Sequence, residues 1–177
     1  FSLQGVIFYG VITWLAPALV ERGYSTLEAG TVVGVMLIFG IPGTLLVSWI
    51  GDRLPSRRVG MAVTSVETLI AVAGFAFVPS LALVWAVIGG LGLAGIFAMV
   101  MTLPLDAATR PSEVAAYSGV MLSVGYLASA VAPASLGAVR DATGNFDATM
   151  LLLVVAAVAL LVVSTVLTPV RLRPRPT

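Results

Sequence analysis

Six long apolar segments constrain this chain more than any other feature. Charged residues, prolines and glycines separate them, at about 3–20, 27–50, 59–78, 81–103, 114–138 and 148–168. A helix that crosses the hydrocarbon core of a bilayer needs roughly 20 apolar residues, so each segment is long enough to span it. The segments are continuous, whereas the strands of a membrane barrel alternate in polarity over about ten residues. The pattern therefore predicts six transmembrane helices.

The composition requires lipid as the main solvent. Of the 177 residues, 59% are hydrophobic and 10% are charged, while a soluble domain usually carries about 25% charged residues. We expect an all-α polytopic membrane protein whose first partner is the lipid bilayer. Its six-helix bundle is predicted over residues 1–170 and a basic cytoplasmic tail over 171–177. The net charge of +1 gives no indication of nucleic-acid binding.

The arginines predict the orientation of the bundle. The chain has no lysine, and its nine basic residues are all arginines. If the first span starts on the cytoplasmic side, that side carries Arg53, Arg57, Arg58, Arg110, Arg171, Arg173 and Arg175, and the opposite side carries Arg22 and Arg140. Cytoplasmic loops are enriched in basic residues. We therefore expect a multi-pass protein of the inner (plasma) membrane with both termini in the cytoplasm.

Several reactive residue types are absent. The sequence contains no cysteine and no histidine, which excludes disulfides, thiolate and imidazole metal ligands and Ser-His catalysis. It also has no GxxxxGK[ST] loop and no lysine that could contact a nucleotide phosphate. We therefore expect no enzyme activity, no cofactor and no metal site, and any energy for transport would come from a gradient.

A few polar and aromatic residues interrupt the apolar spans. The first span contains Gln4, Phe8, Tyr9 and Trp14, and the fifth contains Tyr126. A polar group at membrane depth costs free energy unless it meets a partner or water, so these residues are candidates for lining a cavity. Alternatively, Gln4 and Trp14 lie near the membrane interfaces, where amphipathic side chains are common.

Prolines and glycines within the spans predict bends and close packing. Pro42 in the second span and Pro133 in the fifth each remove a backbone hydrogen bond, so each is either a static kink or a hinge. Gly30 and Gly34 form a GxxxG pair in the second span, and Gly90, Ala94 and Ala98 repeat every four residues in the fourth. Small residues at this spacing let membrane helices approach closely, and we interpret both sets as packing faces.

Glu67 is an acid well inside a predicted span. A carboxylate within the membrane is a functional candidate by default, here for proton coupling. The alternatives are that Glu67 hydrogen-bonds to the neighbouring Thr64 or Thr68, or that it pairs with a group outside these six spans.

Charged residues gather in two of the predicted cytoplasmic loops. The loop after the second span contains Asp52, Arg53, Arg57 and Arg58, which form either a latch between helices or a solvated anchor. Asp106 and Arg110 follow the fourth span and are four residues apart. On a helical turn this spacing brings two side chains together, so the pair is predicted to form a loop clasp.

The loop at Asp52-Arg53 and Arg57-Arg58 resembles the cytoplasmic signature of major facilitator transporters, with one extra residue between its two pairs. Trp14-Leu15-Ala16-Pro17, Glu21-Arg22-Gly23-Tyr24-Ser25 and Leu105-Asp106-Ala107-Ala108-Thr109-Arg110 are similar to segments of the second half of that fold. They resemble in particular the branch that includes cyanate and nitroimidazole transporters. The resemblance covers essentially the whole chain.

The resemblance implies that the six spans are helices seven to twelve of a twelve-helix transporter. Such proteins bind a solute near the midplane between two halves and rock one half against the other. The first, second, fourth and fifth spans would line the cavity, and the third and sixth would face lipid. The implied partners are an N-terminal six-helix half, or a second copy of this chain, and a small-molecule substrate.

The resemblance therefore favours secondary active transport, by alternating access, of a small polar or anionic organic solute or a drug-like compound of the cyanate or nitroimidazole type. A membrane scaffold without transport activity is the alternative. Convergence of Gln4, Tyr9 and Tyr126 on one accessible face would favour transport.

Overall fold

Six long helices make up the fold. In a computed structural model, residues 1–51 and 57–166 are described, and no strand occurs among them. The helices are α1 (Ser2–Glu21), α2 (Thr26–Gly51), α3 (Arg57–Phe77), α4 (Ala82–Ala107), α5 (Pro111–Thr143) and α6 (Asp147–Val166), with a short 3₁₀ turn η1 (Pro79–Leu81) before α4. All six are long and apolar enough to cross a membrane. The predicted all-α polytopic class is confirmed.

Two helices are longer than the sequence pattern indicated. The fourth segment was expected to end near residue 103, but α4 continues to Ala107. The fifth was expected at 114–138, but α5 covers Pro111–Thr143. Charged residues within α5, such as Arg140, do not break a helix, whereas Gly144 adopts a left-handed conformation (φ 77°) that ends it.

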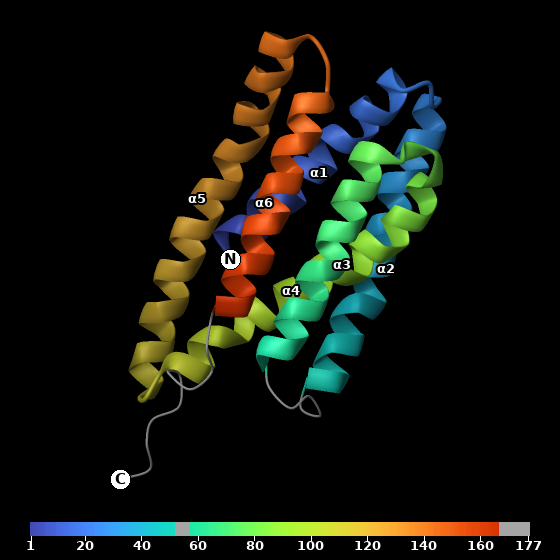
Figure 1. The fold of residues 1–177 in the computed structure, drawn as a ribbon. Coiled ribbons are helices and arrows are strands. Elements are labelled where there is room, and N and C mark those ends of the chain that lie inside the picture. Colours follow the sequence, from blue (N-terminus) through green and yellow to red (C-terminus); the bar gives the residue numbers. More distant parts are fainter. Residues whose placement is uncertain (52–56, 167–177) are drawn as a thin grey trace.

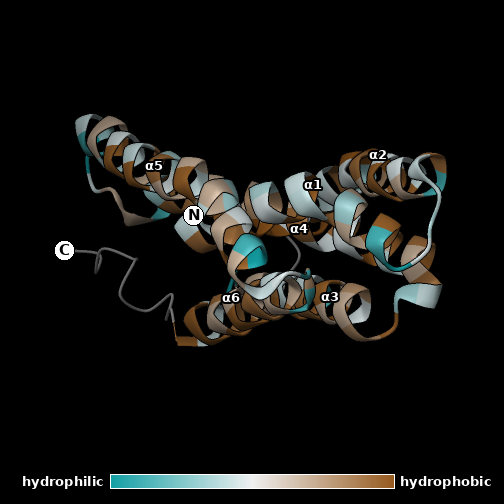
Figure 2. Ribbon diagram, turned by 90° about the horizontal axis from the view of Figure 1, so that it is seen from above, coloured by the Kyte–Doolittle hydropathy of each residue, from teal (hydrophilic) through white to brown (hydrophobic). Residues whose placement is uncertain are grey.

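The helices run alternately up and down, and they form two rows (Figures 1 and 2). One row contains α5, α1, α4 and α2, and the other contains α6 and α3. The main contacts between the rows are α3 with α4 and α1 with α6, while α3 and α6 pack on each other. This arrangement leaves α1, α2, α4 and α5 together on one side of the molecule.

Glycines set the closest helix packing, between α2 and α4. A Cβ atom at Gly43 would lie 2.7 Å from the carbonyl oxygen of Leu91, and one at Gly90 would overlap the carbonyl oxygen of Met36. Only glycine permits this approach of two backbones. By contrast, a Cβ atom at Gly30 or Gly34 would meet no atom within 4 Å. The predicted GxxxG pair therefore takes no part in packing within the described residues, which is a correction.

Charged side chains connect three helices at one end of the bundle. The Arg22 side chain donates from Nη1 to the carbonyl oxygen of Phe75 (2.6 Å) and from Nη2 to Oδ1 of Asp147 (2.9 Å). The carboxylate of Glu21 accepts a hydrogen bond from the backbone N–H of Phe146 (3.1 Å). One guanidinium thus connects the end of α1 with the end of α3 and the start of α6.

Candidate functional site

A central cavity of about 350 Å³ lies between α1, α2, α4 and α5. Phe1 lines it, and the N-terminus lies near mid-height in the bundle (Figure 1). The full lining is Phe1, Gln4, Gly5, Phe8, Tyr9, Met36, Leu37, Gly40, Ile41, Thr44, Gly89, Gly90, Leu93, Ala94, Phe97 and Tyr126. These residues belong to the four spans that the resemblance assigned to a cavity.

Gln4 is the most deeply buried polar side chain of this cavity. Its exposed fraction is 4%, and no hydrogen bond joins its carboxamide to another of the described residues. The next residue, Gly5, lies against Ser129 of α5, and a Cβ atom at Gly5 would overlap the Ser129 hydroxyl. This close approach of α1 to α5 holds Gln4 in the wall of the cavity, away from the ends of the bundle.

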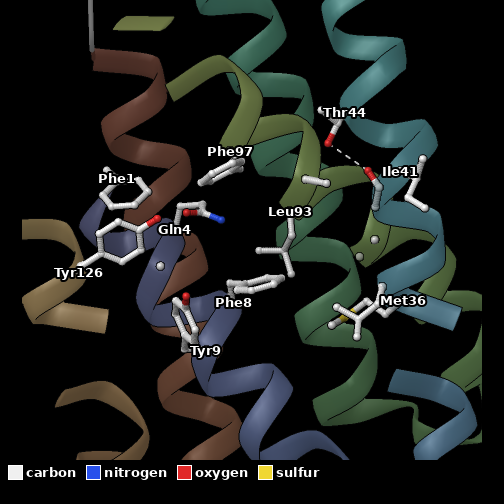
Figure 3. A pocket seen from close by; sticks show the side chains of 16 residues that line it. Phe1, Gln4, Phe8, Tyr9, Met36, Ile41, Thr44, Leu93, Phe97 and Tyr126 are labelled. Carbon is white, nitrogen blue, oxygen red and sulfur yellow. Dashed lines mark hydrogen bonds between the residues drawn. The ribbon is translucent and has the colours of Figure 1, made fainter. Parts of the chain in front are cut away.

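Aromatic rings surround Gln4 in the cavity wall. The ring of Phe1 meets that of Tyr126 edge to face, with centroids 5.1 Å apart and an interplanar angle of 83°. Phe97 lies 6.2 Å from Phe1, and Phe8 and Tyr9 form a second edge-to-face pair at 5.4 Å. Figure 3 shows these rings around the carboxamide. Edge-to-face pairs are favourable and restrain one another, so the wall is well ordered.

The described residues of the lining include polar side chains but no charged one. Besides Gln4, the polar groups are the hydroxyls of Tyr9, Thr44 and Tyr126. The Thr44 hydroxyl donates to the carbonyl oxygen of Gly40 (3.1 Å), as Figure 3 shows. The remaining groups can bind a solute through hydrogen bonds and ring contacts.

Trp14 lies elsewhere, contrary to the expectation that it contacts the cavity. Its indole Nε1 donates to the carbonyl oxygen of Pro133 (2.9 Å), and its ring packs beside Phe146 and over Gly137. Trp14 follows Gln4 by ten residues, which at about 100° per residue turns it to a different face of α1 and moves it about 15 Å along the axis. Trp14 therefore connects α1 to α5.

Both candidate hinge prolines lie inside continuous helices. Pro42 is next to Ile41, which lines the cavity, and α2 continues as α-helix past it. α5 likewise continues past Pro133, whose carbonyl oxygen accepts the bond from Trp14. Their roles as hinges stay predictions.

Glu67 lies outside the central cavity. It lines a second cavity of about 200 Å³ between α2, α3 and α4. The hydroxyls of Thr64 and Thr68 donate to backbone oxygens of Gly60 (2.9 Å) and Thr64 (2.8 Å), so the expectation that they bond to Glu67 is wrong. Within the described ranges its carboxylate has no hydrogen bond or ion pair. Proton coupling through Glu67 stays a prediction.

Arg57 connects the start of α3 to the end of α4. Its Nε lies 2.8 Å from Oδ2 of Asp106, and its Nη1 donates to the hydroxyl of Thr102. Arg58 is exposed beside it. The other two residues of the predicted latch, Asp52 and Arg53, lie outside the described residues. The contact between Arg57 and Asp106 was not predicted, although the arginine distribution already placed both residues at the same end of the bundle.

The predicted Asp106–Arg110 pair is wrong. α4 ends at Ala107, and Ala108 is extended (φ −80°, ψ 141°), so the two residues do not share a helical turn. Arg110 instead precedes α5 as its N-cap. The Glu113 carboxylate accepts hydrogen bonds from the backbone N–H groups of Thr109 (2.8 Å) and Arg110 (3.3 Å). These contacts fix the start of α5.

Several known proteins that are similar to this chain are transporters. The 2-nitroimidazole transporter of Escherichia coli (strain K12) is 28% identical over 146 residues, which cover 82% of this chain and 37% of the relative. An uncharacterized transporter of Bacillus subtilis (strain 168) is 30% identical over 161 residues, which cover 90% of this chain and 40% of the relative. The cyanate transport protein of E. coli (strain K12) is 27% identical over 172 residues, which cover 97% of this chain and 44% of the relative.

The chain spans about two fifths of the length of these relatives. No solved structure gave a significant match. The family model of the Major Facilitator Superfamily matches residues 1–133, which is well over half of the chain. Together with the six membrane-spanning helices and the cavity between four of them, this match gives the family. The chain belongs to the Major Facilitator Superfamily.

Proposed function

We propose that this chain is the C-terminal half of a secondary transporter that moves a small organic solute across the inner membrane by alternating access. The observation that carries the proposal is the convergence of Gln4, Tyr9 and Tyr126 on one cavity. These side chains come from two helices that are far apart in the sequence. A scaffold without transport activity would need the packing of the helices but no such polar cavity.

The proposed partner is an N-terminal six-helix half that covers the open side of the cavity. Leu37 and Ile41 line the cavity and are exposed in this half. The relatives are more than twice as long as the segment they share with this chain, which supports a second half. The arginine distribution supports cytoplasmic termini, and the relatives' names suggest a solute of the nitroimidazole or cyanate type.

We assign a state-dependent contact to the charges at the proposed cytoplasmic end. Arg57 and Asp106 join α3 to α4, and both side chains are partly accessible to solvent. A contact of this kind forms and breaks at small free-energy cost. Asp52, Arg53 and Arg58 would belong to the same latch.

Cysteine labelling tests alternating access without knowledge of the solute. This chain has no cysteine, so a single one can be introduced at Tyr126 in the full-length protein after any cysteines of the other half are replaced. We expect Tyr126→Cys to react with a membrane-impermeant maleimide from either side of the membrane in turn, because a rocking transporter opens its cavity alternately.

The control is Val155→Cys on α6, an exposed residue outside the cavity lining. It should face lipid and react from neither side. Labelling of Tyr126→Cys from one side only, or from neither, would contradict the proposed function.

A further inference from the structure

We infer that this half of the cavity selects an uncharged, planar nitrogen heteroaromatic ring over an anion, and that Gln4 recognises the polar edge of the ring. The inference rests on the proposed function, because it concerns the solute of the same cavity. It goes beyond that function because it chooses between two kinds of solute. One is a flat ring and the other a small anion, as in the names of the 2-nitroimidazole transporter and the cyanate transport protein.

The aromatic wall favours a flat ring. Phe1, Phe97 and Tyr126 gather around one part of the cavity, with centroid distances of 5.1 Å and 6.2 Å from Phe1 to the other two. Aromatic groups pack favourably edge to face or offset on one another, so a flat aromatic solute gains contacts here that a linear solute cannot make. The volume of about 350 Å³ suits one small ring system.

The Gln4 carboxamide supplies the polar contact. It is 4% exposed and has no hydrogen-bond partner among the described residues. A carboxamide offers two N–H donors and one carbonyl acceptor side by side. Glutamine uses this pair to bind the edge of adenine, where a ring nitrogen acceptor lies next to an amino donor. A heteroaromatic ring satisfies both functions of Gln4 when a donor and an acceptor lie side by side, either on the edge of the ring or in a carboxamide substituent.

The lack of charge disfavours an anion. Among residues 1–51 and 57–166, no charged side chain lines the cavity. Arg22 is bound to Asp147 and Phe75 at one end of the bundle, and Arg57 is bound to Asp106 and Thr102 at the other. An anion that enters an apolar site without a compensating charge loses its hydration at high cost. This half of the cavity therefore offers no compensation to a carboxylate or to cyanate.

Two molecules of the same shape test the selectivity directly. Nicotinamide and nicotinate share one ring and differ in that the first carries an uncharged amide and the second a carboxylate. Calorimetric titration of the purified full-length protein should show nicotinamide binding at least about tenfold more tightly than nicotinate. Equal affinities, tighter binding of nicotinate, or binding of neither would overturn the inference.

Substitution of Gln4 tests its role. Gln4→Leu keeps the approximate size of the side chain but removes the amide, and it should weaken nicotinamide binding by about tenfold. Thr31→Val is the control, because it removes a hydroxyl on α2 that donates to the carbonyl oxygen of Leu27 (2.8 Å) and lies outside the cavity lining. Its affinity should change by less than about threefold. Unchanged affinity in Gln4→Leu would exclude recognition by Gln4.

Different results would refute the ring selectivity and the transport function. Two-sided labelling of Tyr126→Cys together with absence of ring binding would refute the inference and leave the proposed function standing. Absence of two-sided labelling would refute the proposed function itself. If Gln4→Leu does not fold, the preference of the unsubstituted protein for nicotinamide over nicotinate still decides the charge selectivity.

Discussion

At the scale of single residues, each polar side chain in the bundle takes its role from the group it meets. The indole of Trp14 meets a backbone carbonyl at Pro133 and connects two helices. The carboxamide of Gln4 meets no such group and faces a cavity. A hydrogen bond between helices stabilises the fold, whereas a polar group without a protein partner is available to a ligand.

Trp14→Phe should therefore destabilise the protein and leave solute binding intact. The substitution removes one hydrogen bond, worth about 1 kcal/mol, and reduces packing over Gly137. The thermal unfolding midpoint of the full-length protein should fall by a few degrees, while the affinity for nicotinamide stays the same. Loss of binding with an unchanged midpoint would place Trp14 in the cavity after all.

Ile41→Trp should block the cavity. Ile41 lines it and is 64% exposed in this half, whereas Ile38, three residues earlier on α2, is equally exposed at 63% and lies outside the lining. The larger ring at position 41 takes up space that the solute needs, so solute uptake into proteoliposomes should fall by about tenfold or more. Ile38→Trp should retain most of the uptake. Equal losses in both variants would mean that the cavity is not the route.

The candidate cavity residues also show how much of the site could be predicted from the sequence. Gln4, Phe8, Tyr9 and Tyr126 are conspicuous among apolar neighbours, and all four line the cavity. Trp14 is equally conspicuous but lies on another face of α1. The face of a helix that meets a cavity depends on how its neighbours pack, and an almost uniformly apolar span carries no periodicity that would reveal this.

At the scale of helices, α2 and α4 form the closest pair. Gly43 and Gly90 bring their backbones together beside the cavity, so the width of the cavity depends on this contact. The sequence predicted the existence of the helices from their length and apolar character. It marked Gly90 as part of a small-residue packing face, but it marked Gly30 and Gly34 in the same way, and these two face open space in this half.

Gly90→Ala should separate α2 from α4. The added methyl group would overlap the backbone of Met36, and overpacking of this kind costs about 1–3 kcal/mol. Gly34→Ala is the matched control, because its methyl group meets no atom within 4 Å, and alanine favours a helix by up to about 1 kcal/mol. Thermal unfolding of both variants measures the difference. Equal destabilisation would contradict the packing described for Gly90.

At the scale of the whole molecule, two features that lie outside the central cavity are proposed to act in its movement. Arg57 and Asp106 join two helices at one end, and Glu67 faces a separate cavity between α2, α3 and α4. The sequence marked all three residues as functional candidates. It paired Asp106 with Arg110, because the point where α4 ends could not be read from residues that are compatible with either a helix or a loop.

Asp106→Asn should alter the conformational equilibrium more than the stability. The ion pair is partly exposed, so its loss should cost less than about 1 kcal/mol. The rate at which Tyr126→Cys is labelled from the cytoplasmic side should change when Asp106→Asn is added. The charge exchange Arg57→Asp with Asp106→Arg should restore the original rate if the pair acts as a latch. An unchanged labelling rate in Asp106→Asn would argue against this role.

The variant Glu67→Gln should distinguish the binding of the solute from the coupling of its transport to protons. Glu67 lies outside the central cavity, so nicotinamide affinity should stay the same. If Glu67 carries the coupled proton, accumulation driven by a pH gradient should be lost in proteoliposomes, while exchange of labelled for unlabelled solute continues. Undiminished accumulation would exclude Glu67 as the coupling site. Asp141→Asn, which removes an exposed carboxylate near the end of α5, serves as the control for the loss of a carboxylate elsewhere in the chain.

The Arg22 contacts bear on the mechanics of the half. Because one guanidinium joins α1, α3 and α6 at a single end, we expect this end to act as a fulcrum for helices about 30 Å long, at about 1.5 Å per residue. A tilt of a few degrees then produces little displacement near Arg22 and its largest displacement at the far end, where Arg57 meets Asp106. The bundle would thereby turn a small rotation near the fulcrum into the opening of the opposite end.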